Sequence, residues 1–184
     1  MKAILSQFGN VPNMITLLRI VLIPVFVIAL VYQRYDYALV LFVVAGLTDM
    51  LDGLWARLTN KKTNLGAFLD PMADKALLLT SFILFSVYGW VPKWLTITVI
   101  SRDIIVVMGW LLLSVTSHET KVAPTLAGKA AIASQLVLIA YVLLSINLPE
   151  LPDETPLPAA IIVAGLTVFS GVQYIYRGLS QHGK

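Results

Sequence analysis

Residues 49–74 read DMLDGLWARLTNKKTNLGAFLDPMAD, and the acidic residues of this stretch recur at helical spacing. Asp49 and Asp52 are three positions apart, and Asp70 and Asp74 are four apart, so each pair shares one face of a helix. A short loop joins the two helices that carry these pairs, so the helices are expected to run antiparallel and to bring four carboxylates to one membrane depth. Such a cluster repels itself unless it binds cations or takes up protons.

The composition places these helices in a membrane. Of the 184 residues, 58% are hydrophobic and 12% are charged, whereas soluble domains average about 45–50% and roughly 25%. About 20 helical residues cross a bilayer, so the chain has room for about six spans and for no separate soluble domain. We therefore expect an all-α integral membrane protein in which residues 1–184 form a single domain.

Apolar runs and their breakers predict six transmembrane helices. Their expected bounds are 13–32, 37–58, 67–88, 95–115, 127–146 and 157–176. The loops on one side carry Lys61, Lys62 and Lys121, and those on the other carry only Arg34 and Lys93. Because positively charged short loops stay in the cytoplasm, both termini and the aspartate cluster are expected there. With basic residues spread in this way, the net charge of +3 favours lipid headgroups over nucleic acid as the anionic partner.

The residue types around the carboxylates favour a metal and phosphate site. The chain has no cysteine, and His118 and His182 are far away in the sequence, so a carboxylate site suits the hard ions Mg²⁺ or Mn²⁺. Gly53 and Gly66 leave room for a ligand, and Arg57 can offer its planar donors to a phosphate. Ion pairs between helices are the alternative for single residues, but the acids outnumber the nearby fixed cations.

Written as a pattern, this stretch is D-x2-D-G-x2-A-R-x8-G-x3-D-x3-D, and it resembles the signature of the CDP-alcohol phosphatidyltransferases. Every fixed position is filled, by Asp49, Asp52, Gly53, Ala56, Arg57, Gly66, Asp70 and Asp74. The resemblance extends over nearly the whole chain, including Asn13, Thr16 and Arg19 of the first helix. It implies six transmembrane helices, a homodimer, and a site that opens to the cytoplasm.

The resemblance also implies a reaction and roles for these residues. The phosphatidyl group of CDP-diacylglycerol would pass to an acceptor alcohol, and CMP would leave. Asp49, Asp52 and Asp70 would hold two divalent ions, Mg²⁺ or Mn²⁺, against the CDP diphosphate, while Asp74 would contact a metal and act as general base. The CDP pocket would include Asp52, Gly53, Ala56, Arg57 and Gly66, and also Asn13 and Thr16, whose presence helix capping explains equally well.

The acceptor alcohol is expected to be bound by residues outside the signature, namely Arg102, Asp103 and Lys129. Phosphatidylglycerophosphate synthases typically have Arg-Glu at the first two positions and Gly-Lys-x-Lys-Thr around the third, so the second lysine is missing here. This site would offer fewer cations to a dianionic phosphate. Residues 45–49, residues 101–103 and the Pro-Thr pair ahead of Lys129 are more similar to eukaryotic-type cardiolipin synthases. The resemblance therefore implies phosphatidylglycerol as the acceptor, with glycerol 3-phosphate as the alternative. A local ion pair between Arg102 and Asp103, and snorkelling of Lys129 to the interface, also remain open.

A cation or proton transporter is the rival from another class, because transporters also carry carboxylates inside the membrane. Transporters usually bind their ions near the midplane, on broken helices and between inverted repeats. This chain shows no repeat, and its acids lie at predicted helix ends. A purely structural helix bundle is a second rival, but it would not need the acidic cluster.

Overall fold

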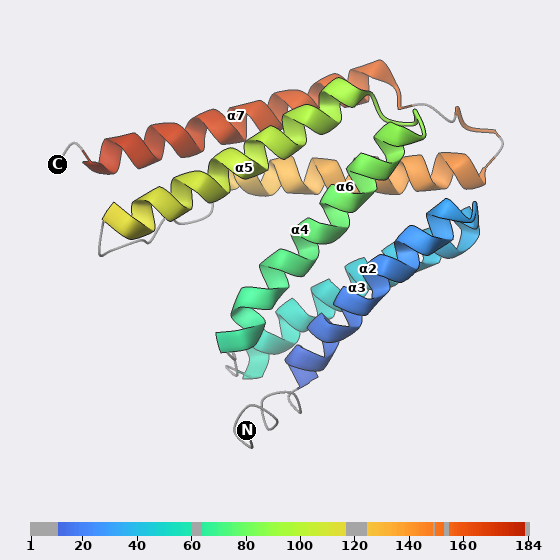
Figure 1. Cartoon of the computed structure of the whole chain (residues 1–184), viewed down its shortest axis with the longest axis horizontal. Helices are drawn as coiled ribbons and strands as arrows, with labels where there is room; N and C mark the ends of the chain where they lie inside the picture. Colours follow the sequence, from blue (N-terminus) through green and yellow to red (C-terminus); the bar gives the residue numbers. More distant parts are fainter. Residues whose placement is uncertain (1–10, 60–63, 117–124, 149, 153–154, 183–184) are drawn as a thin grey trace. The chain divides into compact units, whose positions relative to one another are not determined.

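The computed structural model describes residues 11–59, 64–116, 125–148, 150–152 and 155–182, with side chains for 18, 20–48, 75–109, 125–148, 150–152 and 155–177 (Figure 1). The described part is helical and contains no strand. Its helices are α2 (Val11–Val31), α3 (Tyr35–Thr59), α4 (Asn64–Val87), α5 (Lys93–Thr116), α6 (Leu126–Asn147) and α7 (Leu157–His182). The six predicted helices are therefore confirmed.

The largest difference from the predicted bounds is at the end of α7, which continues to His182 instead of ending at residue 176. The prediction ended this helix where the apolar run ends. A helix ends where its backbone is interrupted, however, and the polar residues after Tyr176 include no proline. The apolar run therefore corresponds to the part of α7 that is apolar enough to cross a bilayer, Leu157–Arg177, and is shorter than the helix.

The chain divides into two compact units, and each has its own apolar core. The first contains α2, α3, the part of α4 up to Ser81, and the short segment after Ile146. Here α2 and α3 lie side by side (Figure 1), and the rings of Phe26 and Phe42 pack with their centroids 6.5 Å apart. Asn147 donates a hydrogen bond from Nδ2 to the carbonyl oxygen of Tyr35 at 3.1 Å, at the first residue of α3.

The second unit contains the end of α4, α5, most of α6, and α7. Within it α5 and α7 lie side by side. Its fully buried apolar residues include Phe82, Phe85, Leu95, Ile139, Val142, Leu143 and Ala160. The turn between α4 and α5 is tied to the start of α7, because the amide and the hydroxyl of Thr155 both donate to the carbonyl oxygen of Trp90, at 2.9 and 2.8 Å.

Besides its apolar core, this unit has buried polar residues, and other large apolar residues are exposed on its surface. Gln135 on α6 donates from Nε2 to Thr167 Oγ1 on α7 at 3.0 Å, and both residues are buried. On the outer face of α7, Ile162 and Phe169 each expose 61% of their surface. Extended apolar surface on a soluble monomer would be unusual, so this arrangement indicates a protein that associates with a membrane.

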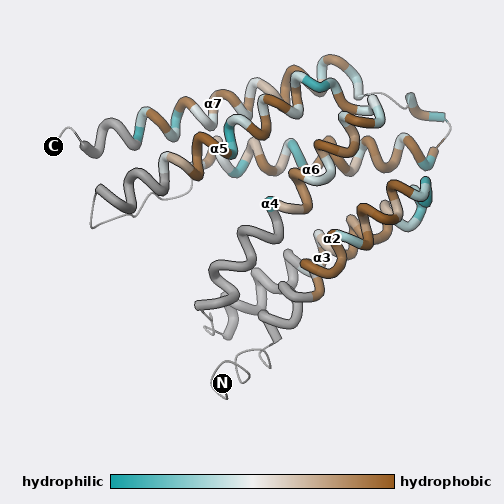
Figure 2. Tube along the Cα trace, in the orientation of Figure 1, coloured by the Kyte–Doolittle hydropathy of each residue, from teal (hydrophilic) through white to brown (hydrophobic). Residues whose placement is uncertain are grey.

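Two helices in the described part are long and apolar enough to cross a bilayer, Leu126–Asn147 and Leu157–Arg177. The described stretches of α2, α3 and α4 add shorter apolar segments, Ile20–Val31, Tyr35–Thr48 and Lys75–Val87. Hydrophobic residues predominate along the coloured parts of α2 and α3 (Figure 2). Within the described residues each predicted helix is thus confirmed in position, whereas six membrane crossings stay a prediction.

Candidate active site

The predicted aspartate motif lies on two consecutive helices. Asp49, Asp52, Gly53, Ala56 and Arg57 are in the last part of α3, and Gly66, Asp70 and Asp74 are at the start of α4. Because an α-helix turns about 100° per residue, the members of each acidic pair lie within about 60° of one another around the helix axis. The helical spacing on which the prediction depends is therefore confirmed.

The side chains of this motif, and those of Asn13 and Thr16 in α2, lie outside the described residues. The meeting of the four carboxylates accordingly stays a prediction. The donor set nevertheless fits a hard divalent ion, since carboxylate oxygens are the preferred ligands of Mg²⁺ and Mn²⁺. Among the side chains that the structure describes, no three histidine, aspartate or glutamate residues form a group that could hold a metal.

Two of the three predicted acceptor residues, Arg102 and Asp103, are in contact on α5. Arg102 donates from Nη1 to Asp103 Oδ1 at 2.7 Å, and the two side chains are only 10% and 13% exposed. The ion pair that the sequence left open for them is therefore present. A buried charge needs such a partner, because leaving water without one costs several kcal/mol by order of magnitude.

Arg102 also reaches α7. Its Nη2 donates to Ser170 Oγ at 2.8 Å, and Ser170 is 1% exposed. A Cβ atom added at Gly171, the next residue of α7, would lie 3.3 Å from Arg102 Cγ. The absence of a side chain at Gly171 thus lets the backbone of α7 approach Arg102 closely.

The third predicted acceptor residue, Lys129, is exposed near the start of α6. Its neighbour Gly128 lies against Arg102, because a Cβ atom at position 128 would be 3.5 Å from Arg102 Nη2. Thr125 caps this end of α6 by accepting a hydrogen bond on Oγ1 from the amide of Gly128 at 3.0 Å. The structure thus brings Gly128, the residue before Lys129, close to Arg102.

The sequence interpretation missed Ser170 and Gly171. A serine followed by a glycine inside an otherwise apolar membrane helix is a signal that could have marked them, since small residues let neighbouring helices approach closely in membranes. The partner of Ser170 could not have been read in this way, because Arg102 is 68 positions away in the chain.

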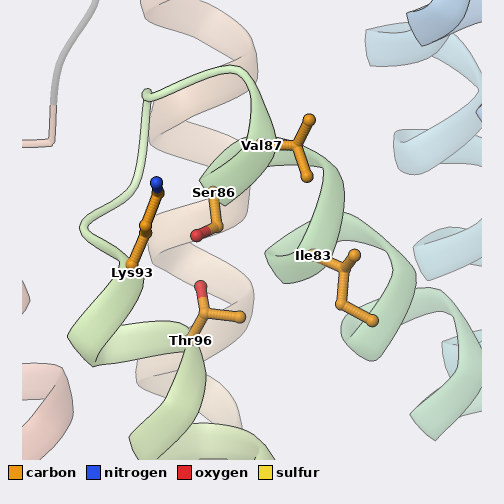
Figure 3. Close-up of a pocket in the computed structure, with 5 residues that line it drawn as sticks. All are labelled: Ile83, Ser86, Val87, Lys93 and Thr96. Carbon is orange, nitrogen blue, oxygen red and sulfur yellow. The ribbon is translucent and has the colours of Figure 1, made fainter.

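A cleft of about 380 Å³ lies between the last turns of α4 and the first turn of α5. Its lining residues are Ile83, Ser86, Val87, Lys93 and Thr96. Figure 3 shows the hydroxyl groups of Ser86 and Thr96 pointing toward each other from the two helices. The lining of this cleft contains no carboxylate and none of the predicted site residues.

Comparison with known proteins identifies the family of the chain. The model of the CDP-alcohol phosphatidyltransferase family matches residues 9–172. A protein of Mycobacterium tuberculosis named probable phosphatidylglycerophosphate synthase is 34% identical, over 97% of this chain and 86% of its own length.

Two further relatives carry the name CDP-diacylglycerol–glycerol-3-phosphate 3-phosphatidyltransferase. The protein of Bacillus subtilis is 36% identical over 91% of this chain and 94% of its own length. That of Escherichia coli K12 is 33% identical over 90% of this chain and 93% of its own length. Because the family model and the similarity to these relatives cover most of its length, the chain belongs to the CDP-alcohol phosphatidyltransferase family.

Proposed function

We propose that this protein transfers the phosphatidyl group of CDP-diacylglycerol to glycerol 3-phosphate, giving phosphatidylglycerophosphate and CMP. The observation that carries the proposal is the set of relatives, each at least 33% identical over most of both chains, that are named for this product or this acceptor. Membership of the family also replaces the transporter as the interpretation of the acidic cluster.

This proposal reverses the preference for phosphatidylglycerol that the sequence around Arg102 and Lys129 favoured. That preference depended on one missing lysine, on aspartate in place of glutamate after the arginine, and on the similarity of a few short segments to cardiolipin synthases. A single cation is weak evidence against a dianionic acceptor, because three-dimensional structure can bring cations together from distant parts of the chain. The similarity to the relatives extends over nearly the whole chain and therefore outweighs these short segments.

The acceptor phosphate is proposed to bind near Arg102 and Lys129. Arg102 is held at the meeting point of α5, α6 and α7 by its contacts with Asp103 and Ser170 and by its proximity to Gly128. An arginine has five N–H donors, so three remain after these two hydrogen bonds. Lys129 follows Gly128 and is exposed, and its flexible ammonium group can therefore meet an incoming phosphate.

The chemistry is proposed to take place at the aspartate motif. The divalent ions, when bound by Asp49, Asp52, Asp70 and Asp74, supply charge stabilisation for the phosphate oxygens. Arg57, with Gly53 and Ala56 on the same helix, is proposed to line the CDP site, together with Asn13, Thr16 and Gly66. Asp74 accepts the proton of the attacking hydroxyl as its oxygen bonds to the phosphatidyl phosphorus, and the bond from that phosphorus to the oxygen of CMP breaks.

The setting of this site is part of the proposal. We take the chain to be a single domain with six transmembrane helices, since even the shortest described helix, with 21 residues, is about 31 Å long. Both termini and the aspartate motif are proposed to face the cytoplasm, from which water-soluble glycerol 3-phosphate can reach the site. A homodimer is proposed on the family resemblance alone.

The test is an assay of the purified protein with CDP-diacylglycerol and Mg²⁺ or Mn²⁺, in which glycerol 3-phosphate and phosphatidylglycerol are offered separately. Mass spectrometry of the lipid products distinguishes the two reactions. Phosphatidylglycerophosphate with stoichiometric CMP is the expected result, and omission of the divalent ion should abolish it. Cardiolipin formed from phosphatidylglycerol, with no product from glycerol 3-phosphate, would overturn the proposed acceptor.

A further inference from the structure

The contact between Arg102 and Ser170 is unusual among the serine contacts of the described residues. Ser81, Ser134 and Ser145 donate to carbonyl oxygens of their own helices, at 2.8, 2.8 and 2.9 Å. Ser170 instead accepts a hydrogen bond from a charged side chain of another helix. Its hydroxyl therefore restrains the guanidinium group, and this hydrogen bond does not involve the backbone of α7.

Both terminal nitrogens of the Arg102 guanidinium group are hydrogen-bonded, but not all of its N–H donors are paired. Asp103 holds Nη1 and Ser170 holds Nη2, so the plane of the group is set by two elements, α5 and α7. In the described part of the chain, Arg102 Nε has no hydrogen-bond partner although it is buried. Buried polar atoms are nearly always paired, and an unpaired one calls for a water molecule or a ligand.

The packing around the guanidinium group keeps its orientation and leaves its Nε–H unpaired. Gly171 and Gly128 border Arg102 from α7 and α6 without side chains. An arginine side chain has many rotamers, and two polar partners reduce them to a narrow set before any ligand arrives. Arg102 is thus preorganised, with its Nε–H and the unused Nη hydrogens free for a planar pair of hydrogen bonds to phosphate oxygens.

We propose that Ser170 is a positioning residue for the acceptor: together with Asp103 it orients Arg102 so that the guanidinium group binds the phosphomonoester of the acceptor alcohol. This inference rests on the proposed function, because it takes Arg102 as part of the acceptor site. Ser170 itself does not touch the substrate. Its effect is on the binding of the acceptor, and the binding of CDP-diacylglycerol and the chemical step are independent of it.

The variant Ser170→Ala tests this role. Loss of a hydrogen bond to a charged group and of the orientation it gives should raise the KM for glycerol 3-phosphate about tenfold. The KM for CDP-diacylglycerol and kcat should change less than about twofold. Ser170→Thr, which keeps the hydroxyl group, should restore the acceptor KM. Ser170→Cys, similar in size but a weaker acceptor, should give an intermediate value even if the alanine variant folds poorly.

Thr167→Val is the matched control. Thr167 is three residues before Ser170 on the same helix, is equally buried, and accepts a hydrogen bond from another helix, but its partner is Gln135. This variant should lower the thermal midpoint and leave the acceptor KM within about twofold of the wild type. If it raises the acceptor KM as much as Ser170→Ala does, the effect is a general loosening of α7 and the positioning role is wrong.

A double-mutant cycle separates the proposed role from the proposed function. In an Arg102→Lys background the compact ammonium group cannot be held at both ends, so Ser170→Ala should add no further increase in the acceptor KM. An active wild type with an unchanged acceptor KM in Ser170→Ala overturns the positioning role and leaves the proposed function intact. A wild type that forms no phosphatidylglycerophosphate overturns the proposed function, and the positioning role with it.

Discussion

At the scale of single residues, the glycines of α7 differ in what surrounds them. A Cβ atom at Gly171 would lie 3.3 Å from Arg102 Cγ, whereas nothing lies within 4 Å of one at Gly165. Both residues are inside the same helix, where alanine is favoured over glycine by up to about 1 kcal/mol. Alanine variants at the two positions should therefore differ because of the space around Arg102 and not because of helix propensity.

Gly171→Ala is expected to displace Arg102 and to raise the acceptor KM several-fold, because the added methyl group presses on its side chain. Gly165→Ala should leave the KM unchanged and keep or slightly raise the thermal midpoint. Steady-state kinetics with glycerol 3-phosphate and thermal melting in detergent measure both effects. Equal kinetics of the two variants would show that Arg102 accommodates the methyl group without consequence.

The aspartates of the motif lead to a second prediction at this scale. Asp74→Asn removes the proposed proton acceptor, so it should abolish turnover while metal-dependent binding of CDP-diacylglycerol is largely kept. Asp70→Asn should weaken that binding as well. The thermal stabilisation by CDP-diacylglycerol with Mg²⁺ measures binding separately from turnover.

Asp36→Asn is a suitable control for this pair, because Asp36 is an exposed residue of the first turn of α3 whose ion-pair partner is Arg34, at 3.7 Å. It should change neither turnover nor the stabilisation by donor and metal. Near-normal turnover of Asp74→Asn would exclude the general-base role.

At the scale of helices, the hydrogen bond between Gln135 and Thr167 joins α6 to α7 inside the second unit. Thr167→Val leaves the buried amide of Gln135 without its acceptor, which should cost about 1–3 kcal/mol of stability. The double variant Gln135→Leu with Thr167→Val removes both polar groups and should recover most of this loss. Thermal or denaturant melting in one detergent compares the variants, and a double variant less stable than Thr167→Val would contradict the argument.

The helices were also the most predictable level of the structure. Apolar runs ended by Pro92, by the proline-rich segment before α7 and by polar turns located all six helices, since these residues interrupt helices through local chemistry. The contact of Arg102 with Ser170 was out of reach, because it depends on how α5 and α7 pack and involves residues 68 positions apart. The acceptor was inferred from two short segments, and similarity along the whole chain favours the other candidate.

At the scale of the whole molecule, the absence of cysteine from the sequence makes the proposed topology directly testable. Single cysteines at Arg34, in the turn between α2 and α3, and at Lys61, in the segment between α3 and α4, are predicted to lie on opposite sides of the membrane. In sealed cells or vesicles, a membrane-impermeant maleimide should label Arg34→Cys from outside and Lys61→Cys only after the membrane is opened. Labelling of both from the same side would contradict the topology, and the cysteine-free parent gives the background.

The two hydrogen bonds from Thr155 to the carbonyl oxygen of Trp90 carry a consequence for the order in which the chain is made. The partners are 65 positions apart, and Thr155 emerges from the ribosome only after α5 and α6. During synthesis the turn between α4 and α5 is therefore made well before the amide and the hydroxyl that Thr155 donates to it. Assembly of the second unit is completed by its last helix, and a nascent chain truncated before Thr155 would lack the contact that closes this end of the unit.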